Sequence, residues 1–442
     1  MSRLTSLRQK NCISSRKPGY LDRKSETKES KILVYLTCLY IVVWYLQLGT
    51  RIDILGAVRF EFLLGAFLSA TAIIKLLNQQ EKASPLKGSI VFYYSVLIVY
   101  TAFSYDHATS WDVFFNRVFK FSMIAMFFAA FIQSTWALKL AVAAFLLAML
   151  KIGQEGFVGW YGGGLVWENQ GVMRLHGSTP LIRHPNSFSG MAVGCLPFIY
   201  FLYPVAGQIW KKILLLVLLI LCALIIVFTA SRTGYVATSL LLLYAILKLE
   251  KANRKKIVVI ALIVFPLSLP FVPEQYIDRF ESIFTMQEAE GQSAATRLEI
   301  ISDAISIAAT KPWGIGVGAF PKVRQETFGR FQDTHNLYLE LLTNLSLIGL
   351  LAFLYLISRI IKLNIRIQKT LQEDNRNEPE FVKALTKATV GFVIARLFLG
   401  LFGMDAYEIY WWFAIGLTIS CYRSTIGLGY SSHQIASAGT EQ

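Results

Sequence analysis

Charged residues are scarce in this sequence. Of its 442 residues only 16% are charged, while 55% are hydrophobic and the mean hydropathy is +0.49. A soluble protein carries about a quarter charged residues. The shortage therefore excludes an ordinary soluble domain and indicates an integral membrane protein.

Cysteine and histidine are also rare, with five of each. The cysteines form no CxxC pair, the histidines lack metal-ligand spacing such as HxxxH or HExxH, and no DxD motif occurs. A bound metal needs several such ligands in one place. The sequence therefore predicts neither a disulfide framework nor a metal site, and no cofactor.

Long apolar runs are abundant. A membrane-spanning helix needs roughly 20 apolar residues. Candidate spans of about this length lie at 32–48, 60–77, 88–104, 113–132, 135–152, 187–205, 209–230, 233–247, 256–272, 335–358, 388–403 and 406–422. The pattern predicts an all-α polytopic membrane protein with about 12 transmembrane helices, or as few as ten.

Lysine and arginine fall on alternate connections of this arrangement. Residues 1–31 hold nine of them against three acids, and the other basic connections lie on the same side. Because cytoplasmic loops carry the positive excess, both termini are expected to be cytoplasmic. The net charge of +15 then reflects topology and attraction to membrane lipids, without nucleic acid.

Two connections on the opposite side are long, at 153–186 and 273–334. Long loops in such proteins often carry function. We expect a basic cytoplasmic tail at 1–31, N-terminal transmembrane helices at 32–152, a catalytic membrane region at 153–422 that includes both loops, and a C-terminal tail at 423–442. The second loop is expected to carry short amphipathic helices.

Arginines gather on this outer side, where topology disfavours them. Arg174 and Arg183 stand in the first loop, and Arg232 follows in the tight turn FTASRTG. Thr296 and Glu299 fit a capping box that starts an amphipathic helix at 297–309. That helix would project Arg297 from its first turn. The alternative for a single arginine is snorkelling to headgroups.

His335 stands at the outer end of an apolar span, in DTHNLYLELL. With Asp333 or Thr334 as N-cap, His335 would lie in the first helical turn. The positive end of the helix dipole then favours neutral imidazole, the form that a general base requires. Asn336 and Glu340, spaced four apart, would support each other on one face. The alternative is an interfacial histidine with no chemistry.

Arginine forks bind phosphate oxygens, and a neutral histidine can take a proton from a sugar hydroxyl. Together they suit glycosyl transfer from a polyprenyl-diphosphate-linked glycan. Arginines stabilise the departing diphosphate without a metal ion, and direct displacement inverts the anomeric centre.

The same residues carry a family resemblance. The ordered motifs RLHGSTPLIRHPNSFSG, TASRTG, TRLEIISDAISIAATKPWGIGVGAF and THNLYLELLTNLSLIG cover roughly 170–360 and resemble the O-antigen ligase and polymerase superfamily of bacterial membrane glycosyltransferases. The resemblance implies a GT-C-type enzyme of the inner membrane in lipopolysaccharide or polysaccharide biosynthesis. It would use undecaprenyl-diphosphate-linked glycan at the periplasmic face.

The resemblance also implies residue roles. His335 would be the catalytic base, Arg232 and Arg297 would bind diphosphate, and Arg174 and Arg183 would contact phosphate or acceptor. A ligase would use lipid A–core as acceptor, and a polymerase would use a second lipid-linked repeat unit. A flippase for lipid-linked glycan is the rival from another class. Lack of visible internal repeats disfavours it.

Overall fold

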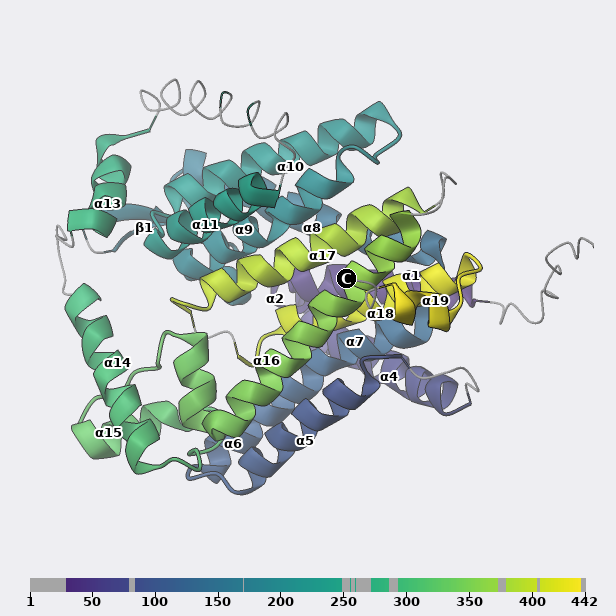
Figure 1. Ribbon diagram of the computed structural model, residues 1–442. Coiled ribbons are helices and arrows are strands. Elements are labelled where there is room, and N and C mark those ends of the chain that lie inside the picture. The colour runs from purple at the N-terminus through teal and green to yellow at the C-terminus, as the bar shows by residue number, and fades with distance from the viewer. Residues whose placement is uncertain are drawn as a thin grey trace, which may run out of the picture.

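The structure is a computed structural model that describes residues 29–78, 84–169, 171–248, 272–285, 293–372, 379–403 and 406–438, with Lys255 and Val259. Within these residues the chain is mostly helical (Figure 1). The predicted tail 1–31 and span 256–272 fall almost wholly outside them.

Most helices precede the second long loop. These elements are α1 (Lys31–Leu46), α2 (Leu48–Arg51), α3 (Asp53–Ala57), α4 (Phe60–Asn78), α5 (Lys87–Ala102), α6 (His107–Val113), the π-helix η1 (Phe114–Phe119), α7 (Lys120–Phe131), α8 (Thr135–Tyr161), β1 (Val166–Asn169), β2 (Val172–Leu175), the 3-10 helix η2 (Pro180–Ile182), α9 (Pro185–Leu202), α10 (Ile209–Phe228) and α11 (Arg232–Lys248). The remaining elements are α13 (Glu274–Thr285), α14 (Ser293–Thr310), α15 (Phe320–Phe328), α16 (Leu337–Gln372), α17 (Glu380–Leu399), α18 (Ile409–Gly427) and α19 (Ser432–Ser437).

Helices cover most of each predicted span that falls in the described residues. Among the residues that the structure describes, five helices are long and apolar enough to cross a membrane: Phe60–Asn78, His107–Phe131, Thr135–Tyr161, Ile209–Phe228 and Leu337–Gln372. Three shorter apolar helices, α1, α5 and most of α11, accompany them. The chain is therefore a multi-pass helical membrane protein.

The first long loop is shorter than predicted. Helix α8 continues to Tyr161, more than two turns beyond the end expected for this span at 152. The rest of the loop forms a two-stranded antiparallel hairpin in which Trp167 pairs with Arg174. This hairpin is a small exception to the all-α prediction. The second loop does carry short helices, namely α13, α14 and α15.

The bundle is layered. Helix α17 contacts α9, α11 and α16, and α16 in turn contacts α5, which contacts α6. Figure 1 shows the same order, with α11 and α9 above α17 and with α16, α5 and α6 below it. Aromatic rings fill the centre, where Phe413 lies 4.8 Å from Phe145 between ring centroids. Thus α9 and α11 lie on one side of α16 and α17, and α5 and α6 lie on the other side.

Helix α16 is broken inside its apolar stretch. Ser346 has φ 57° and ψ −175°, which is not helical, so carbonyls of the preceding turn lose their intrahelical partners. The glycine-rich turn at 314–318 supplies donors: Ile315 N donates to Thr343 O at 3.0 Å, and Gly316 N donates to Asn344 O at 2.9 Å. This turn brings the chain back to the membrane bundle.

Candidate functional site

The β-hairpin fixes Arg174, whose side chain is buried. Its Nε donates to Thr229 O at 2.9 Å, and its Nη2 donates to Asn186 Oδ1 at 2.8 Å. The same Asn186 oxygen accepts a hydrogen bond from Ser231 Oγ at 2.9 Å. One amide thus joins the hairpin, the start of α9 and the turn that leads into Arg232.

Four arginines gather around this point. The charges of Arg279, Arg232 and Arg297 all act on Arg174, and with burial as the largest cause they lower the pKa of Arg174 to about 10. Arg174 remains a cation at neutral pH. We call Arg174, Arg232, Arg279 and Arg297 the arginine cluster. Four neighbouring positive charges form a strong site for a multiply charged anion.

Arg279 was missed in the sequence. It lies in α13 and is buried, at 5% exposure. The segment EQYIDRFESIFT has apolar residues at helical spacing, which predicts a helix packed against the protein. Arg279 lies between two of them, Tyr276 and Phe280. A charge set into an apolar face was the available signal.

Arg183 lies apart from these buried groups. It is exposed and follows η2, directly before His184. His184 caps α9, since its Nδ1 accepts a hydrogen bond from Asn186 N at 3.2 Å. Partial burial lowers the pKa of His184, and the charges of Arg174 and His335 lower it further. The two histidines thus border the same site.

His335 is not in a helical turn, contrary to the prediction. It has φ 48°, in the left-handed region that residues other than glycine rarely adopt. Asn336 is the cap, because its Oδ1 accepts hydrogen bonds from Tyr338 N at 2.9 Å and Leu339 N at 3.0 Å. With two donors satisfied by Asn336, neither Asp333 nor Thr334 caps the helix. Such strain is most often found at functional positions.

The histidine is half-buried and its neutral form is favoured. Burial is the main cause that lowers the pKa of His335. The positive charges of Arg297 and Arg324 lower it further, whereas the negative charge of Asp333 raises it. The expected neutral imidazole therefore follows chiefly from burial, not from the end of a helix dipole. Arg297 links His335 to the arginine cluster.

The two supporting residues hold the connection between α17 and α18. Asn336 Nδ2 donates to Leu401 O at 3.0 Å, and the buried Glu340 accepts from Ala406 N at 3.2 Å. In the same connection, the ring of Phe402 faces Arg297, whose Cζ lies 6.0 Å from the ring centroid. This connection therefore touches both sides of the site.

Arg297 is carried by a helix with a different start from that predicted. Helix α14 begins at Ser293, so Thr296 lies inside it and is not its N-cap. Leu298 is exposed, and the buried side presents Ile300 and, on the next two turns, Ala304 and Ile307. A small core with α15, rather than the membrane bundle, selects that face.

A buried ion pair joins α14 to α15. Arg324 is 1% exposed, and its Nε donates to Asp303 Oδ2 at 2.8 Å. Glu299, expected in a capping box, instead pairs with Arg330 and lies 3.6 Å from Arg324 Nη2. These pairs set the orientation of the helix that bears Arg297.

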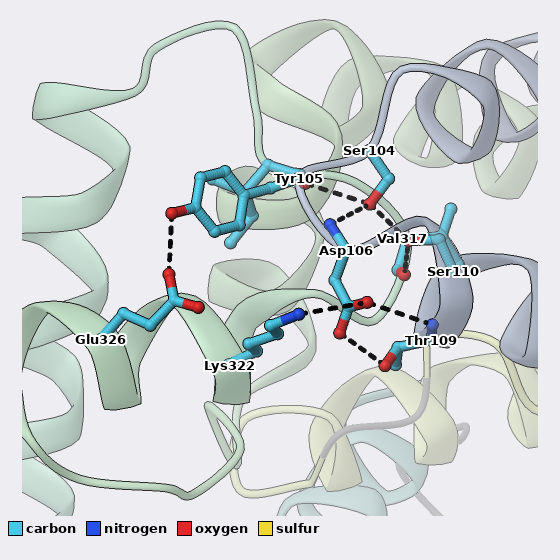
Figure 2. A network of polar contacts seen from close by, with 9 residues as sticks. Ser104, Tyr105, Asp106, Thr109, Ser110, Val317, Lys322 and Glu326 are labelled. Atoms are coloured by element: carbon cyan, nitrogen blue, oxygen red, sulfur yellow. Dashed lines mark hydrogen bonds and ion pairs between the residues drawn. The ribbon is translucent and has the colours of Figure 1, made fainter.

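A second network fastens α15 to the connection between α5 and α6. Figure 2 shows Tyr105 OH donating to Glu326 Oε2 at 2.7 Å, and Lys322 Nζ 3.6 Å from Asp106 Oδ1. Thus α15 is held on both sides, by α14 and by the bundle. The chain that leads from α15 into His335 starts from a fixed point.

The described part of the chain contains no group of three or more His, Cys, Asp or Glu side chains that could hold a metal ion. The charged groups that converge on the site are mainly arginines, with Asp333 beside His335. The structure thus defines a multi-pass membrane protein in which a half-buried histidine borders a cluster of cations.

The family model described as Wzy_C, O-Antigen ligase, matches residues 216–354. That range contains Arg232, Arg279, Arg297 and His335, so the resemblance seen in the motifs is confirmed there. This part of the chain is therefore similar to the O-antigen ligase family. No curated protein matches the chain.

Proposed function

We propose that the protein transfers a glycan from an undecaprenyl diphosphate to a sugar hydroxyl, as an O-antigen ligase-like glycosyltransferase. The observation that carries the proposal is the convergence of His335 and the arginine cluster through Arg297. The family match, printed as O-antigen ligase, supports the general reaction class.

Arg232 and Arg297 hold the diphosphate in this proposal. Within the cluster, Arg232 opens α11 and Arg297 lies in α14. Arg174 is tied to Thr229 and Asn186, so it acts mainly as a fixed charge beneath them. Arg183, which is exposed, lies where it meets the sugar or an outer phosphate. Arginine forks match phosphate oxygens and do not need a metal ion to neutralise them.

His335 takes the proton of the acceptor hydroxyl. The hydroxyl oxygen attacks the anomeric carbon, the bond from that carbon to the phosphate oxygen breaks, and the diphosphate leaves with the electron pair. Displacement on one face inverts the anomeric configuration. A general base contributes about 10²- to 10⁴-fold. Charge on the departing diphosphate is stabilised by cations already in place.

The site lies on the periplasmic face of the bacterial inner membrane in this proposal, with both termini cytoplasmic and about 12 spans of the GT-C type. The catalytic region comprises 153–422, after the N-terminal helices 32–152. Lipid A–core is the acceptor favoured here, because the matching family is described as a ligase. Transfer to a second lipid-linked repeat unit would make the protein a polymerase.

The test is transfer by purified protein in EDTA, with undecaprenyl-diphosphate glycan as donor and both acceptors supplied. We expect product with lipid A–core and none with the Arg297→Gln variant. Product only with the lipid-linked repeat unit would identify a polymerase. No product, together with movement of the donor across the bilayer of reconstituted vesicles, would overturn the proposal in favour of a flippase.

A further inference from the structure

Two cations stand on an exposed side of a candidate membrane span. Arg117 lies in η1 and Lys120 begins α7, one turn later, within the span His107–Phe131. Their side chains are 47% and 49% exposed. Charged side chains in a span normally face the bundle interior or a water-filled cavity. Exposed cations on such a helix therefore need a reason.

The partners of these cations indicate their level in the membrane. Arg117 Nη1 lies 3.3 Å from Glu408 Oε1, and Lys120 Nζ lies 3.1 Å from Glu61 Oε1. Glu408 directly precedes α18, and Glu61 is in the first turn of α4. Both carboxylates are thus at helix ends. Shortly before the start of α18, Ala406 N donates a hydrogen bond to Glu340 in the first turn of α16. The cations therefore lie at the His335 end of the bundle, where lipid headgroups are found.

Asp333, two residues before His335, links this flank to the histidine. Burial is the largest cause and raises the pKa of Asp333, while the positive charges of His335 and then Arg117 act against it. Arg232 approaches from the other side, because α17 lies between α11 and α16 (Figure 1), and Arg297 comes from α14, which contacts α16 itself. His335 is flanked by two separate groups of cations.

The local helix shape suits a ligand at this position. The π-helix Phe114–Phe119 carries Arg117, and single π turns often mark functional sites. Phe115 and Phe119, on either side of Arg117, are 53% and 45% exposed and offer apolar surface to hydrocarbon chains. Each cation uses one N–H direction for its carboxylate. A guanidinium has five N–H donors and an ammonium three, so others remain for phosphate oxygens.

We propose that Arg117 and Lys120 bind the phosphate of the lipid that anchors the acceptor, so that donor and acceptor reach His335 from opposite flanks. This assignment rests on the proposed transfer reaction. It assigns the arginine cluster to the donor diphosphate alone. Lipid A carries such phosphates, whereas a neutral lipid would gain nothing from this flank.

The test measures lipid binding without turnover. Wild type, Arg117→Gln/Lys120→Gln and Arg297→Gln are placed in phosphatidylcholine nanodiscs, and lipid A or undecaprenyl diphosphate is titrated into each. The matched control is Lys151→Gln, which removes a 53% exposed lysine that is paired with Glu155 in another candidate span. Retained binding of the lipid that a variant is not expected to lose shows that the variant is folded.

We expect the Arg117→Gln/Lys120→Gln variant to bind lipid A at least tenfold more weakly and undecaprenyl diphosphate as wild type does. Arg297→Gln should show the reverse, and Lys151→Gln neither change. Equal weakening for phosphatidylglycerol would overturn the proposal, since it would show general headgroup binding. The proposal would also be overturned if the Arg117→Gln/Lys120→Gln variant bound lipid A as wild type does, or if that variant lost its binding of undecaprenyl diphosphate. If binding follows the expectation but no variant or wild type transfers glycan, the reaction is wrong and the lipid site stands.

Discussion

Removal of Asp303 should loosen the outer helices that hold Arg297 and lead into His335. Asp303 is 7% exposed, and its partner Arg324 is 1% exposed. Loss of one partner of a buried pair costs about 3 to 5 kcal/mol, because the other charge stays buried. Glu299, 3.6 Å from Arg324 Nη2, remains in the variant, so we expect the lower half of that range.

Hydrogen exchange of α14 and α15 measures this loss directly, since amides exchange through local opening. Each 1.4 kcal/mol is a factor of ten, so Asp303→Asn should speed exchange there by roughly 10²-fold or more. Helices α9 and α10 should keep their wild-type protection. The control is Lys322→Gln in α15. It removes only the ion pair of a half-exposed lysine with Asp106, which is worth at most about 1 kcal/mol.

A second variant separates a charge effect from a packing effect. Asp303→Leu combined with Arg324→Met removes both charges and should recover most of the protection that Asp303→Asn loses. Wild-type exchange in Asp303→Asn would refute the reasoning. So would a double variant that is less protected than either single change, because then shape and not charge holds the two helices.

Three other variants test separate parts of the site. Asp333→Asn removes the negative charge that raises the pKa of His335, so the acid limb of the transfer rate should move to lower pH; a shift to higher pH would contradict the assignment. Gly316→Ala should lower the melting temperature, since φ is 107° and a Cβ would meet Ser104 Oγ, whereas Gly88→Ala, with open space around it, should not. Asn186→Ala removes the acceptor shared by Arg174 and Ser231. We expect the free energy of unfolding to fall by about 1.5 to 3 kcal/mol, with a lower melting temperature. Unchanged stability would show that the shared amide does not stabilise the fold.

Sequence reasoning succeeded where one local rule decides the outcome. Apolar length alone located the helices, and the scarcity of charge identified the membrane class. Arg174, Arg232 and Arg297 were identified because an arginine on the outer side opposes the positive-inside trend. The structure brings these three together through long-range contacts, and the sequence motifs had suggested only a common face.

It failed where partners distant in the chain decide. Thr296 fits a capping box, yet α14 starts at Ser293 because its buried side is selected by α15. The placement of His335 in a helix failed for a local reason instead, because Asn336, the next residue, takes the backbone donors of Tyr338 and Leu339. The helix break at Ser346 has no signal in its neighbouring sequence. The carbonyls that lose their helical partners there are satisfied by the distant turn at 314–318.

The central claim is that His335 removes the proton of the acceptor hydroxyl beside a diphosphate held by arginines. Single-turnover transfer by His335→Gln, with preloaded donor and saturating acceptor, tests it most directly. The account predicts a rate lower by about 10²- to 10⁴-fold, with donor affinity unchanged. Gln332→Ala, which alters only the neighbour 3.5 Å from His335 Nε2, should stay within about tenfold of wild type. A His335→Gln rate equal to that of wild type would contradict the account.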